Sequence, residues 1–266
     1  MLKNLILING DIVEGEEGKV SLSDRGYQFG DGVFEIVPVY NGRSFALLPH
    51  MENFFDSVIS VKIPGIYMVE ELVSFHEELI AASGLENGEI YTQITRGEAP
   101  YALEFPEMTV PHLSMIAIEN DREDLNTLNR LPSVLAKQKA RVSRAFDALF
   151  VRDDGKITET TESNFFIVKD DLIWTHPANN LILNSVTRRL VKERLAVDIG
   201  MQVIEKAFDL DFALKAEEAF VAGARCEIVP VTKIDRKFIA DGQVGPVTQK
   251  LISEYKKFVL RECPIK

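Results

Sequence analysis

The chain has 266 residues, of which 46% are hydrophobic and 27% charged, a composition typical of a globular protein with one large domain or two ordinary ones. Its formal net charge of −11 and its lack of a basic stripe exclude a general nucleic-acid binder. The apolar run at the start is too short for a signal peptide or a membrane span, so we expect a cytoplasmic protein without membrane contact.

The cysteines and histidines give no sign of a metal centre. Cys226 and Cys263 lie far apart without a Cys-x-x-Cys spacing, which predicts free thiols in a reducing compartment. The four histidines form no metal-ligand spacing with each other or with the cysteines. His76 falls within a helical pattern, and we interpret it as a partly buried helix residue.

Residues 1–119 predict a small α+β domain. Apolar and β-branched runs predict strands within 5–15, 32–50, 89–97 and 112–120. The first two of these segments each contain an Asn-Gly pair that predicts a tight turn between two strands. Helical spacing covers 50–63 and 68–85, and Gly84 is a plausible helix C-cap. The Gly-rich segment 26–35 resembles a phosphate loop, but we interpret it as a turn entering a strand.

The polar connector 118–127 predicts a boundary, with a larger α+β domain at 120–266. Its expected strands are ALFVR, NFFIV, MQVIEKAF and AFVAG, with a hairpin over 229–242. Four helices are expected in this domain. Three of them begin at Pro132, near Ser185 and at Gly245, and the fourth covers 209–219. The order of elements favours a two-domain α+β architecture.

Two places in this second half can carry chemistry. The free amides of Val186 and Thr187, at the start of a helix, can hold a phosphate, although an ordinary Ser-capped helix has the same pattern. Glu159 follows a turn and precedes a buried strand, where its carboxylate either meets solvent or faces a ligand nitrogen.

Several segments in order resemble the class IV aminotransferases: DRGYQFGDGVFE, TRGEAP, LNTLNRLPSVLAKQKA, ITETTESNFFIV, HPANNLILNSVTR, EIVPV and DGQVGPVT. The resemblance runs from about residue 5 to residue 260 and is closest to the D-amino-acid branch; the family also includes branched-chain transaminases and aminodeoxychorismate lyases. It implies the D-amino-acid aminotransferase-like architecture of pyridoxal-phosphate fold type IV, with the site in the cleft between 1–119 and 120–266.

The resemblance also implies roles for individual residues. Glu159 matches the carboxylate that faces the pyridine nitrogen, Leu183 the residue that packs on the ring, and Val186 and Thr187 the phosphate-binding amides. Asn126 stands where the family has the lysine that forms a Schiff base with the cofactor. Asn53 stands where the family has a phosphate-binding Arg.

Further departures surround the same site. The turn Ala222-Gly223-Ala224-Arg225 lacks the family's hydroxyl side chains, and Tyr101 and Leu103 replace the Arg and His of the D-amino-acid branch. Glu162 adds a negative charge where phosphate would lie. Arg225 adds a positive charge in this turn. It can neutralise a phosphate or carboxylate of a ligand, or it can be a salt-bridged surface residue.

We therefore interpret the chain as a class IV aminotransferase-like protein that has lost lysine-dependent transamination, a pseudoenzyme that binds a small anion or an amino-acid-like ligand. Pyridoxal phosphate binding is expected to be weak or absent, with phosphate or another small anion as the alternative occupant, and a homodimer is expected.

The alternative is a working pyridoxal-phosphate enzyme acting on D-amino acids, branched-chain amino acids or aminodeoxychorismate through another lysine. Lys137 and Lys139, interpreted as surface residues, and Lys156 are the candidates for that lysine. A third hypothesis is a non-pyridoxal enzyme that uses Glu159 as a general base beside Arg225.

Overall fold

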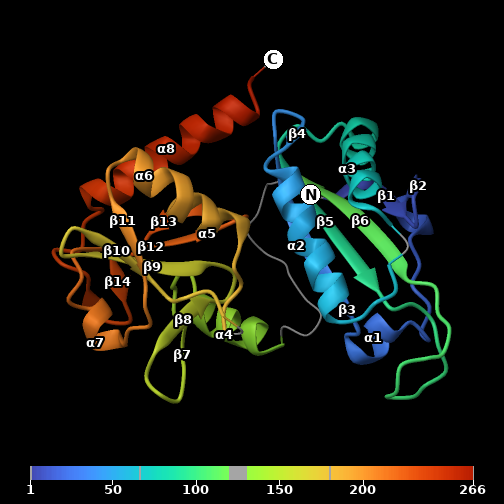
Figure 1. Ribbon diagram of the computed structural model, residues 1–266, viewed down its shortest axis with the longest axis horizontal. Helices are drawn as coiled ribbons and strands as arrows, with labels where there is room; N and C mark the ends of the chain where they lie inside the picture. Colours follow the sequence, from blue (N-terminus) through green and yellow to red (C-terminus); the bar gives the residue numbers. More distant parts are fainter. Residues whose placement is uncertain (1, 66, 120–130, 180, 266) are drawn as a thin grey trace. The chain divides into compact units, whose positions relative to one another are not determined.

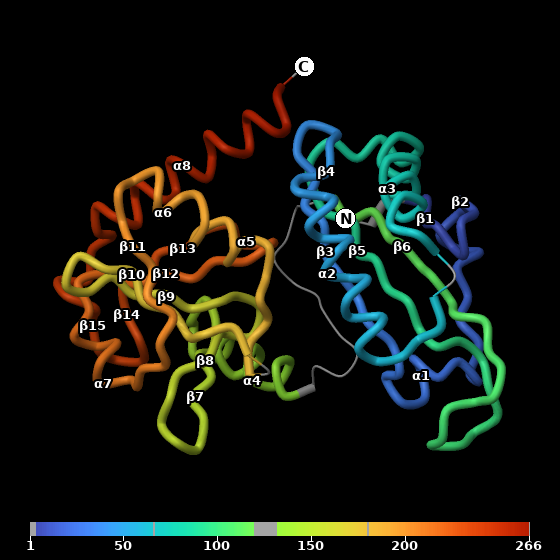
Figure 2. The backbone as a smooth tube through the Cα atoms, viewed as in Figure 1, coloured from blue at the N-terminus to red at the C-terminus, as the bar shows by residue number. Residues whose placement is uncertain are grey.

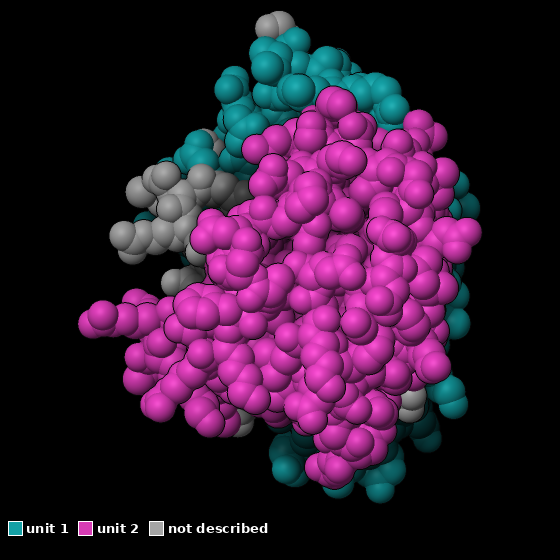
Figure 3. Space-filling model, turned by 90° about the vertical axis from the view of Figure 1, so that its left-hand side faces the viewer, with its two compact units in different colours: residues 1–129, 259–266 teal, residues 130–258 magenta. Residues whose placement is uncertain are grey.

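The computed structural model describes residues 2–65, 67–119, 131–179 and 181–265. The chain divides into two compact units, coloured separately in Figure 3. Unit 1 comprises Met1–Asn129 with Val259–Lys266, and unit 2 comprises Arg130–Phe258. The predicted α+β class is confirmed, because each unit combines a sheet with helices. Within the described residues, no helix has the length and hydrophobicity to cross a bilayer.

Unit 1 is built on a six-stranded antiparallel sheet in the order β2-β1-β6-β5-β3-β4 (Figure 1). Its strands are β1 (Leu2–Ile8), β2 (Asp11–Glu14), β3 (Gly32–Tyr40), β4 (Arg43–Ser44), β5 (Gly88–Thr95) and β6 (His112–Glu119). Both predicted Asn-Gly turns are confirmed, since Asn9, Gly10, Asn41 and Gly42 all have positive φ, as a type I′ hairpin turn requires.

The helices of unit 1 are α1 (Arg25–Phe29), α2 (Leu47–Ser60) and α3 (Val69–Ser83), with a 3₁₀ turn at Gly15–Glu17. Gly84 ends α3 with a φ of 61°, which confirms the predicted C-cap. Apolar side chains of α2 and α3 pack against one face of the sheet and form the core with, among others, Leu7, Val37, Val39, Ile90, Leu113 and Met115. The strand register places these sheet residues on a common face.

The Gly-rich segment forms a helical turn that the sequence did not predict. Asp24 caps α1 by accepting a hydrogen bond from the Gly26 amide at 2.7 Å, and Gly30 ends the helix with a φ of 66°. The amides of Gly30 and Gly32 donate to Gly26 and Gly30 carbonyls. These amides are bonded within the segment, which agrees with the local interpretation and not with a phosphate loop.

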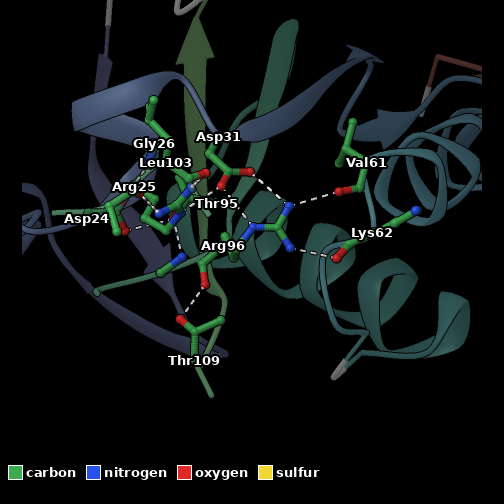
Figure 4. Close-up of polar contacts among 12 residues, drawn as sticks. Asp24, Arg25, Gly26, Asp31, Val61, Lys62, Thr95, Arg96, Leu103 and Thr109 are labelled. Atoms are coloured by element: carbon green, nitrogen blue, oxygen red, sulfur yellow. Dashed lines mark hydrogen bonds and ion pairs between the residues drawn. The ribbon is translucent and has the colours of Figure 1, made fainter. Parts of the chain in front are cut away.

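Asp31 lies between two buried arginines and ties the α1 segment to the end of β5 (Figure 4). Its Oδ2 accepts from Arg25 Nε and from Arg96 Nε, both at 2.8 Å, and its Oδ1 accepts from Arg96 Nη2 at 3.0 Å. Arg96 also donates to the carbonyls of Val61 and Lys62. Burial alone would raise the pKa of Asp31, but the two guanidinium groups outweigh it and lower that pKa.

His76 is fully buried, not partly buried as the sequence suggested. Its Nδ1 lies 2.7 Å from the Leu72 carbonyl and its Nε2 lies 2.9 Å from Thr92 Oγ1. Burial lowers the pKa of His76 to about 4, so the ring is neutral at pH 7. The Nε2 contact connects α3 to β5, and the Nδ1 contact lies within α3.

Unit 2 contains a seven-stranded sheet with the path β11-β10-β9-β12-β13, to which β8 attaches through β9 and β7 through β8. Its strands are β7 (Leu149–Val151), β8 (Ile157–Thr160), β9 (Asn164–Lys169), β10 (Leu172–Thr175), β11 (Gln202–Glu205), β12 (Glu218–Gly223) and β13 (Glu227–Pro230). A separate hairpin, visible in Figure 2, pairs β14 (Lys233–Ile234) with β15 (Lys237–Phe238).

The helices of unit 2 are α4 (Leu131–Val142), α7 (Leu210–Ala213), a continuous helical run formed by α5 (Val186–Leu190), a π-helical turn (Val191–Leu195) and α6 (Ala196–Asp198), and most of α8 (Pro246–Glu262). The end of α8, from Val259, belongs to unit 1. The predicted helix over 209–219 is wrong in length, because Glu218 and Ala219 belong to β12. The core of unit 2 includes Phe165, Ile167, Ala219 and Val221 from the central strands.

Glu218, a buried carboxylate on β12, holds the start of α8. Its two oxygens accept from the amides of Val247 and Thr248 at 2.9 and 2.7 Å. A Cβ at Gly245 would lie 2.1 Å from Glu218 Cδ, so only glycine fits beside this cap. At the other end, Cys263 accepts a hydrogen bond at its carbonyl from Asn41 Nδ2 at 2.7 Å, within unit 1.

We predict that Asp31→Asn lowers the free energy of unfolding of this protein by about 3–5 kcal/mol, because two buried guanidinium groups lose their shared anion. Urea unfolding at pH 7 measures the change. Since the pKa of Asp31 is below its usual value of 3.8 in the folded state, this stabilisation is present above pH 3.8 and is lost as the pH falls further.

The matched control is Asp198→Asn, which removes the same charge from a partly exposed ion pair with Arg194. We expect it to change stability by less than about 1 kcal/mol. Equal effects of the two substitutions would contradict the structural role given to Asp31.

Candidate active site

The carboxylate of Glu159 is held at the end of β8 by groups from two other segments. Its Oε2 accepts from the Leu183 amide at 3.1 Å and from Asn164 Nδ2 at 3.2 Å. Glu159 and Asn164 are register partners of β8 and β9, so the sheet sets their spacing. A carboxylate fixed in this way keeps one orientation.

Asn164 also connects Glu159 to the start of a helix. Its Nδ2 donates to the Leu183 carbonyl at 2.8 Å, and its Oδ1 accepts from Ser185 Oγ at 2.7 Å. Ser185 is the N-cap, and its Oγ accepts from the Arg188 amide at 3.1 Å. The helical run 186–198 therefore begins at a position fixed by β9.

The first two helical residues, Val186 and Thr187, are buried. Their amides have no intrahelical carbonyl to bind, because they lie in the first turn. The positive end of the helix dipole favours an anion at the same place. Two amides and a helix start together provide donors that suit a phosphate or carboxylate group.

Arg188 fixes the other side of this helix start. It is fully buried and donates to Asn184 Oδ1 at 2.8 Å, to the His176 carbonyl at 2.8 Å and to Glu205 Oε1 at 2.5 Å. Burial would raise the pKa of Glu205, but Arg188 and Lys192 hold it below its usual value. Arg188 is thus committed to contacts within unit 2.

A cluster of charged residues lies at the turn between β8 and β9. Lys137 Nζ is 3.5 Å from Glu162 Oε2 and 3.6 Å from Asp147 Oδ1, and Arg225 Nη1 is 3.7 Å from Glu162 Oε1. Thr161 donates its hydroxyl to Asp147 Oδ1. The sequence suggested a surface position for Lys137, and its side chain is 28% exposed, so it is partly buried in this cluster.

The thiol of Cys226 lies next to this cluster. Its Sγ is 3.1 Å from Ser163 Oγ, and burial raises the pKa of Cys226 to about 11. The thiol is therefore protonated at neutral pH and is a poor nucleophile. Both cysteines are free, as the sequence predicted. No group of His, Cys, Asp and Glu in the described part of the chain is arranged to hold a metal ion.

The structure brings five of the predicted site residues into unit 2: Glu159, Leu183, Val186, Thr187 and Arg225. Glu159 and Leu183 are in direct contact through a hydrogen bond, and the Leu183 side chain is 62% exposed. Asn53 belongs to α2 of unit 1, where its carbonyl accepts from Ser57 Oγ. Asn126 lies outside the residues that the structure describes.

The family model for the class IV aminotransferases matches residues 32–234, about three quarters of the chain. The chain belongs to the class IV aminotransferase family. Curated relatives in this family include D-alanine aminotransferases from Staphylococcus haemolyticus, 36% identical, and Bacillus licheniformis, 34% identical. The alignments cover 96% and 97% of this chain and 97% and 98% of those proteins.

Solved structures of the family have the same fold. The branched-chain amino acid aminotransferase of Escherichia coli superposes with a TM-score of 0.90 at 24% identity, covering 99% of this chain and 97% of that one. The branched-chain aminotransferase of the archaeon Thermoproteus uzoniensis, solved with norvaline, has a TM-score of 0.87 at 26% identity, covering 98% and 96%. Another branched-chain aminotransferase, complexed with N-(5'-phosphopyridoxyl)-L-glutamate, has a TM-score of 0.89. The predicted fold-type IV architecture is therefore confirmed.

Sequence reasoning missed the residues that hold this candidate site together. Asn164 is the polar first residue of an apolar strand, which was the available signal for a buried hydrogen-bonding role. Asp147 similarly precedes β7, and its contact with Lys137 depends on how α4 packs. Neither contact follows from spacing along the chain.

We predict that Ser185→Ala lowers the free energy of unfolding by about 1–2 kcal/mol, because the Arg188 amide and Asn164 Oδ1 each lose a partner. Ser185→Thr keeps the hydroxyl and serves as the control, with an expected change of less than about 0.5 kcal/mol. Chemical denaturation of both variants measures the difference. A similar loss for the two would show that the hydroxyl is not what holds the helix start.

Proposed function

We propose that this chain binds pyridoxal phosphate in unit 2 and works as a transaminase on a small amino acid, with a D-amino acid as the first candidate. The carrying observation is the fixed carboxylate of Glu159 next to an apolar, exposed Leu183 and the Ser185-capped start of the 186–198 helix. The similarity to D-alanine aminotransferases over almost the whole chain supports the reaction class. When bound, the cofactor withdraws electrons from the amino-acid Cα.

The residues of unit 2 fit three parts of that cofactor. Glu159 would accept a hydrogen bond from the protonated pyridine nitrogen and keep the positive charge there. The amides of Val186 and Thr187 would donate to the phosphate. Leu183 would cover one face of the ring and exclude water from it. The carboxylate and the amides meet opposite ends of the cofactor, so together they orient it.

Transamination also needs an amine that takes and returns a proton, and an Asn amide at position 126 cannot do so at neutral pH. Lys137 is the candidate we propose among the described lysines of unit 2. Its ammonium lies 3.5 Å from Glu162, in the turn that follows Glu159 and the rest of β8, whereas Lys156 pairs with Asp209 at 3.4 Å and Lys139 is exposed. Lys137 would have to leave its two carboxylates to act as a base.

A second candidate function is binding without turnover. Asn126 at the position of the family's lysine and the Glu162 charge beside Arg225 favour it. Such a protein would hold pyridoxal phosphate weakly, or hold phosphate or another small anion at the start of the 186–198 helix. A non-pyridoxal reaction would need Arg225 beside Glu159, whereas the Arg225 guanidinium lies 3.7 Å from the Glu162 carboxylate.

We predict that the purified protein mixed with pyridoxal phosphate gains an absorption band at about 410–430 nm that borohydride removes, because a lysine amine captures the cofactor aldehyde. Peptide mapping after reduction then places the label on Lys137. D-Alanine with 2-oxoglutarate yields pyruvate, and Lys137→Ala abolishes both signals, whereas Lys139→Ala keeps them.

A protein that gains no band, and forms no pyruvate with excess cofactor, would contradict the transaminase proposal. Tight binding of the cofactor without the band would select the second candidate. A label on Lys156 would keep the reaction class and reject only the assignment of Lys137.

We also propose that the chain forms a homodimer. Five large apolar residues of the segment after β5 are exposed, and exposed apolar residues grouped along one segment suit a protein–protein contact: Tyr101, Leu103, Phe105, Met108 and Val110. Sedimentation equilibrium should give twice the 29.9 kDa mass of one chain. Met108→Asp should weaken association, and Leu260→Asp, an exposed apolar position outside the loop, should not. A monomeric wild-type protein would contradict the proposal.

A further inference from the structure

Residues 98–110 form a segment between β5 and β6 that lies outside the helices and strands. We call it the apolar segment, because five of its large apolar side chains are exposed, from 58% for Phe105 to 89% for Met108. Exposed side chains contribute little buried apolar area to hold a segment in place. A segment with few buried apolar contacts opens readily unless other contacts hold it.

Arg25 bonds directly to the backbone of the apolar segment (Figure 4). Its Nη1 donates to the Ala102 carbonyl at 2.7 Å, and its Nη2 donates to the Leu103 carbonyl at 3.4 Å. The same guanidinium donates through Nε to Asp31 Oδ2 at 2.8 Å. Arg25 is 3% exposed, so water competes little for these charge-assisted hydrogen bonds.

Arg96 meets the apolar segment through an aromatic ring. Its guanidinium carbon lies 3.8 Å from the centroid of the Phe105 ring, which is a cation–π contact. Arg96 shares the Asp31 carboxylate with Arg25 and donates to both of its oxygens. One buried carboxylate therefore orients both cations that touch the segment.

Further contacts lie at the base and in the middle of the apolar segment. At the base, the Thr109 hydroxyl donates to the Arg96 carbonyl at 2.6 Å. In the middle, the Tyr101 ring lies 5.1 Å from the Phe29 ring of α1. The Arg25 guanidinium carbon lies 4.8 Å from the centroid of that Phe29 ring. The aromatic contact in the middle thus adjoins Arg25 as well.

We propose that Arg25, Asp31 and Arg96 form a latch that holds the apolar segment in one conformation, and that the segment opens without unfolding the sheet when Arg25 is lost. Asp31 fixes both guanidinium groups, and Arg25 supplies the bonds to the backbone. The described core residues of unit 1 include none from the apolar segment, so this core can stay intact when the segment opens.

The latch has a consequence for binding. A partner that docks on the apolar segment meets a surface that is already ordered, which lowers the entropy cost of association. The inference goes beyond the proposed function, because it concerns unit 1 alone and does not depend on the reaction.

The test is limited proteolysis with chymotrypsin, which cuts after large apolar residues and requires that the chain first open locally. Arg25→Met removes the donors and keeps a side chain of similar length, while Arg96 leaves Asp31 with a cation. We expect cleavage after Tyr101 and Leu103 to become about tenfold faster, with other sites of unit 1 cut at an unchanged rate. Mass spectrometry of the fragments locates each cut.

A second variant keeps the charge of the latch. Arg25→Lys lacks the planar fork that reaches two carbonyls and a carboxylate together, and it should speed the same two cleavages about threefold. It decides the test if Arg25→Met does not fold. The matched control is Arg43→Met, at an exposed position of β4 in unit 1, and it should leave both cleavage rates unchanged.

Unchanged cleavage after Tyr101 and Leu103 in the folded Arg25 variants would overturn the inference. An equal rise from Arg43→Met, or an equal rise at sites throughout unit 1, would overturn it as well.

Self-association through the same segment would also slow cleavage, so the comparison is repeated in the Met108→Asp background. The faster cleavage of Arg25→Met should persist there. A gain that vanishes in this background would mean that Arg25 acts through association, and the latch would be rejected. Sedimentation of the unchanged protein judges the homodimer separately.

Discussion

The side chain of Asn164 joins the parts of unit 2 on which a ligand site depends. It meets the Glu159 carboxylate, the Leu183 carbonyl and the Ser185 hydroxyl, and so connects β8, the segment before the helix and the helix start. Asn164 is buried, so water cannot replace a hydrogen bond that its side-chain amide loses. A lost bond would leave a buried polar group without a partner, which destabilises the folded state. The sheet register therefore determines where the helix amides lie.

Glu159 and Glu162, on either side of the end of β8, have different partners. Hydrogen bonds from the Leu183 amide and the Asn164 side chain hold the Glu159 carboxylate in one orientation. The Glu162 carboxylate lies 3.5 Å from Lys137 and 3.7 Å from Arg225, so it faces two cations. Of the two, Glu159 is the carboxylate that we propose for the cofactor's ring nitrogen.

Much of the fold could be predicted because local rules and tertiary packing agree. The Asn9-Gly10 and Asn41-Gly42 turns and the Gly84 cap follow from residues that tolerate positive φ. The α1 turn was missed because its cap, Asp24, depends on Thr95 of a distant strand, which donates to the same carboxylate. The helix over 209–219 was drawn too long because strand pairing of Glu218 with β9 overrides its helical propensity.

In the candidate site, residues at the ends of elements could be predicted from the sequence, whereas contacts between elements could not. Glu159 and the amides of Val186 and Thr187 could be singled out as candidates from the sequence because each stands at the end of a recognisable element. The contacts of Lys137 with Asp147 and Glu162, and of Arg225 with Glu162, join residues far apart in the chain. Such ion pairs depend on packing between elements, which spacing does not encode. From the sequence alone, Arg225 could equally bind a ligand anion or form a salt bridge. The structure supports a salt bridge with Glu162.

The most direct test is a crystal structure of the protein grown with pyridoxal phosphate. We expect phosphate oxygens within hydrogen-bonding distance of the Val186 and Thr187 amides, the pyridine nitrogen against the Glu159 carboxylate, and Leu183 on one face of the ring. Cofactor bound elsewhere, or no cofactor in this place at saturating concentration, would contradict it.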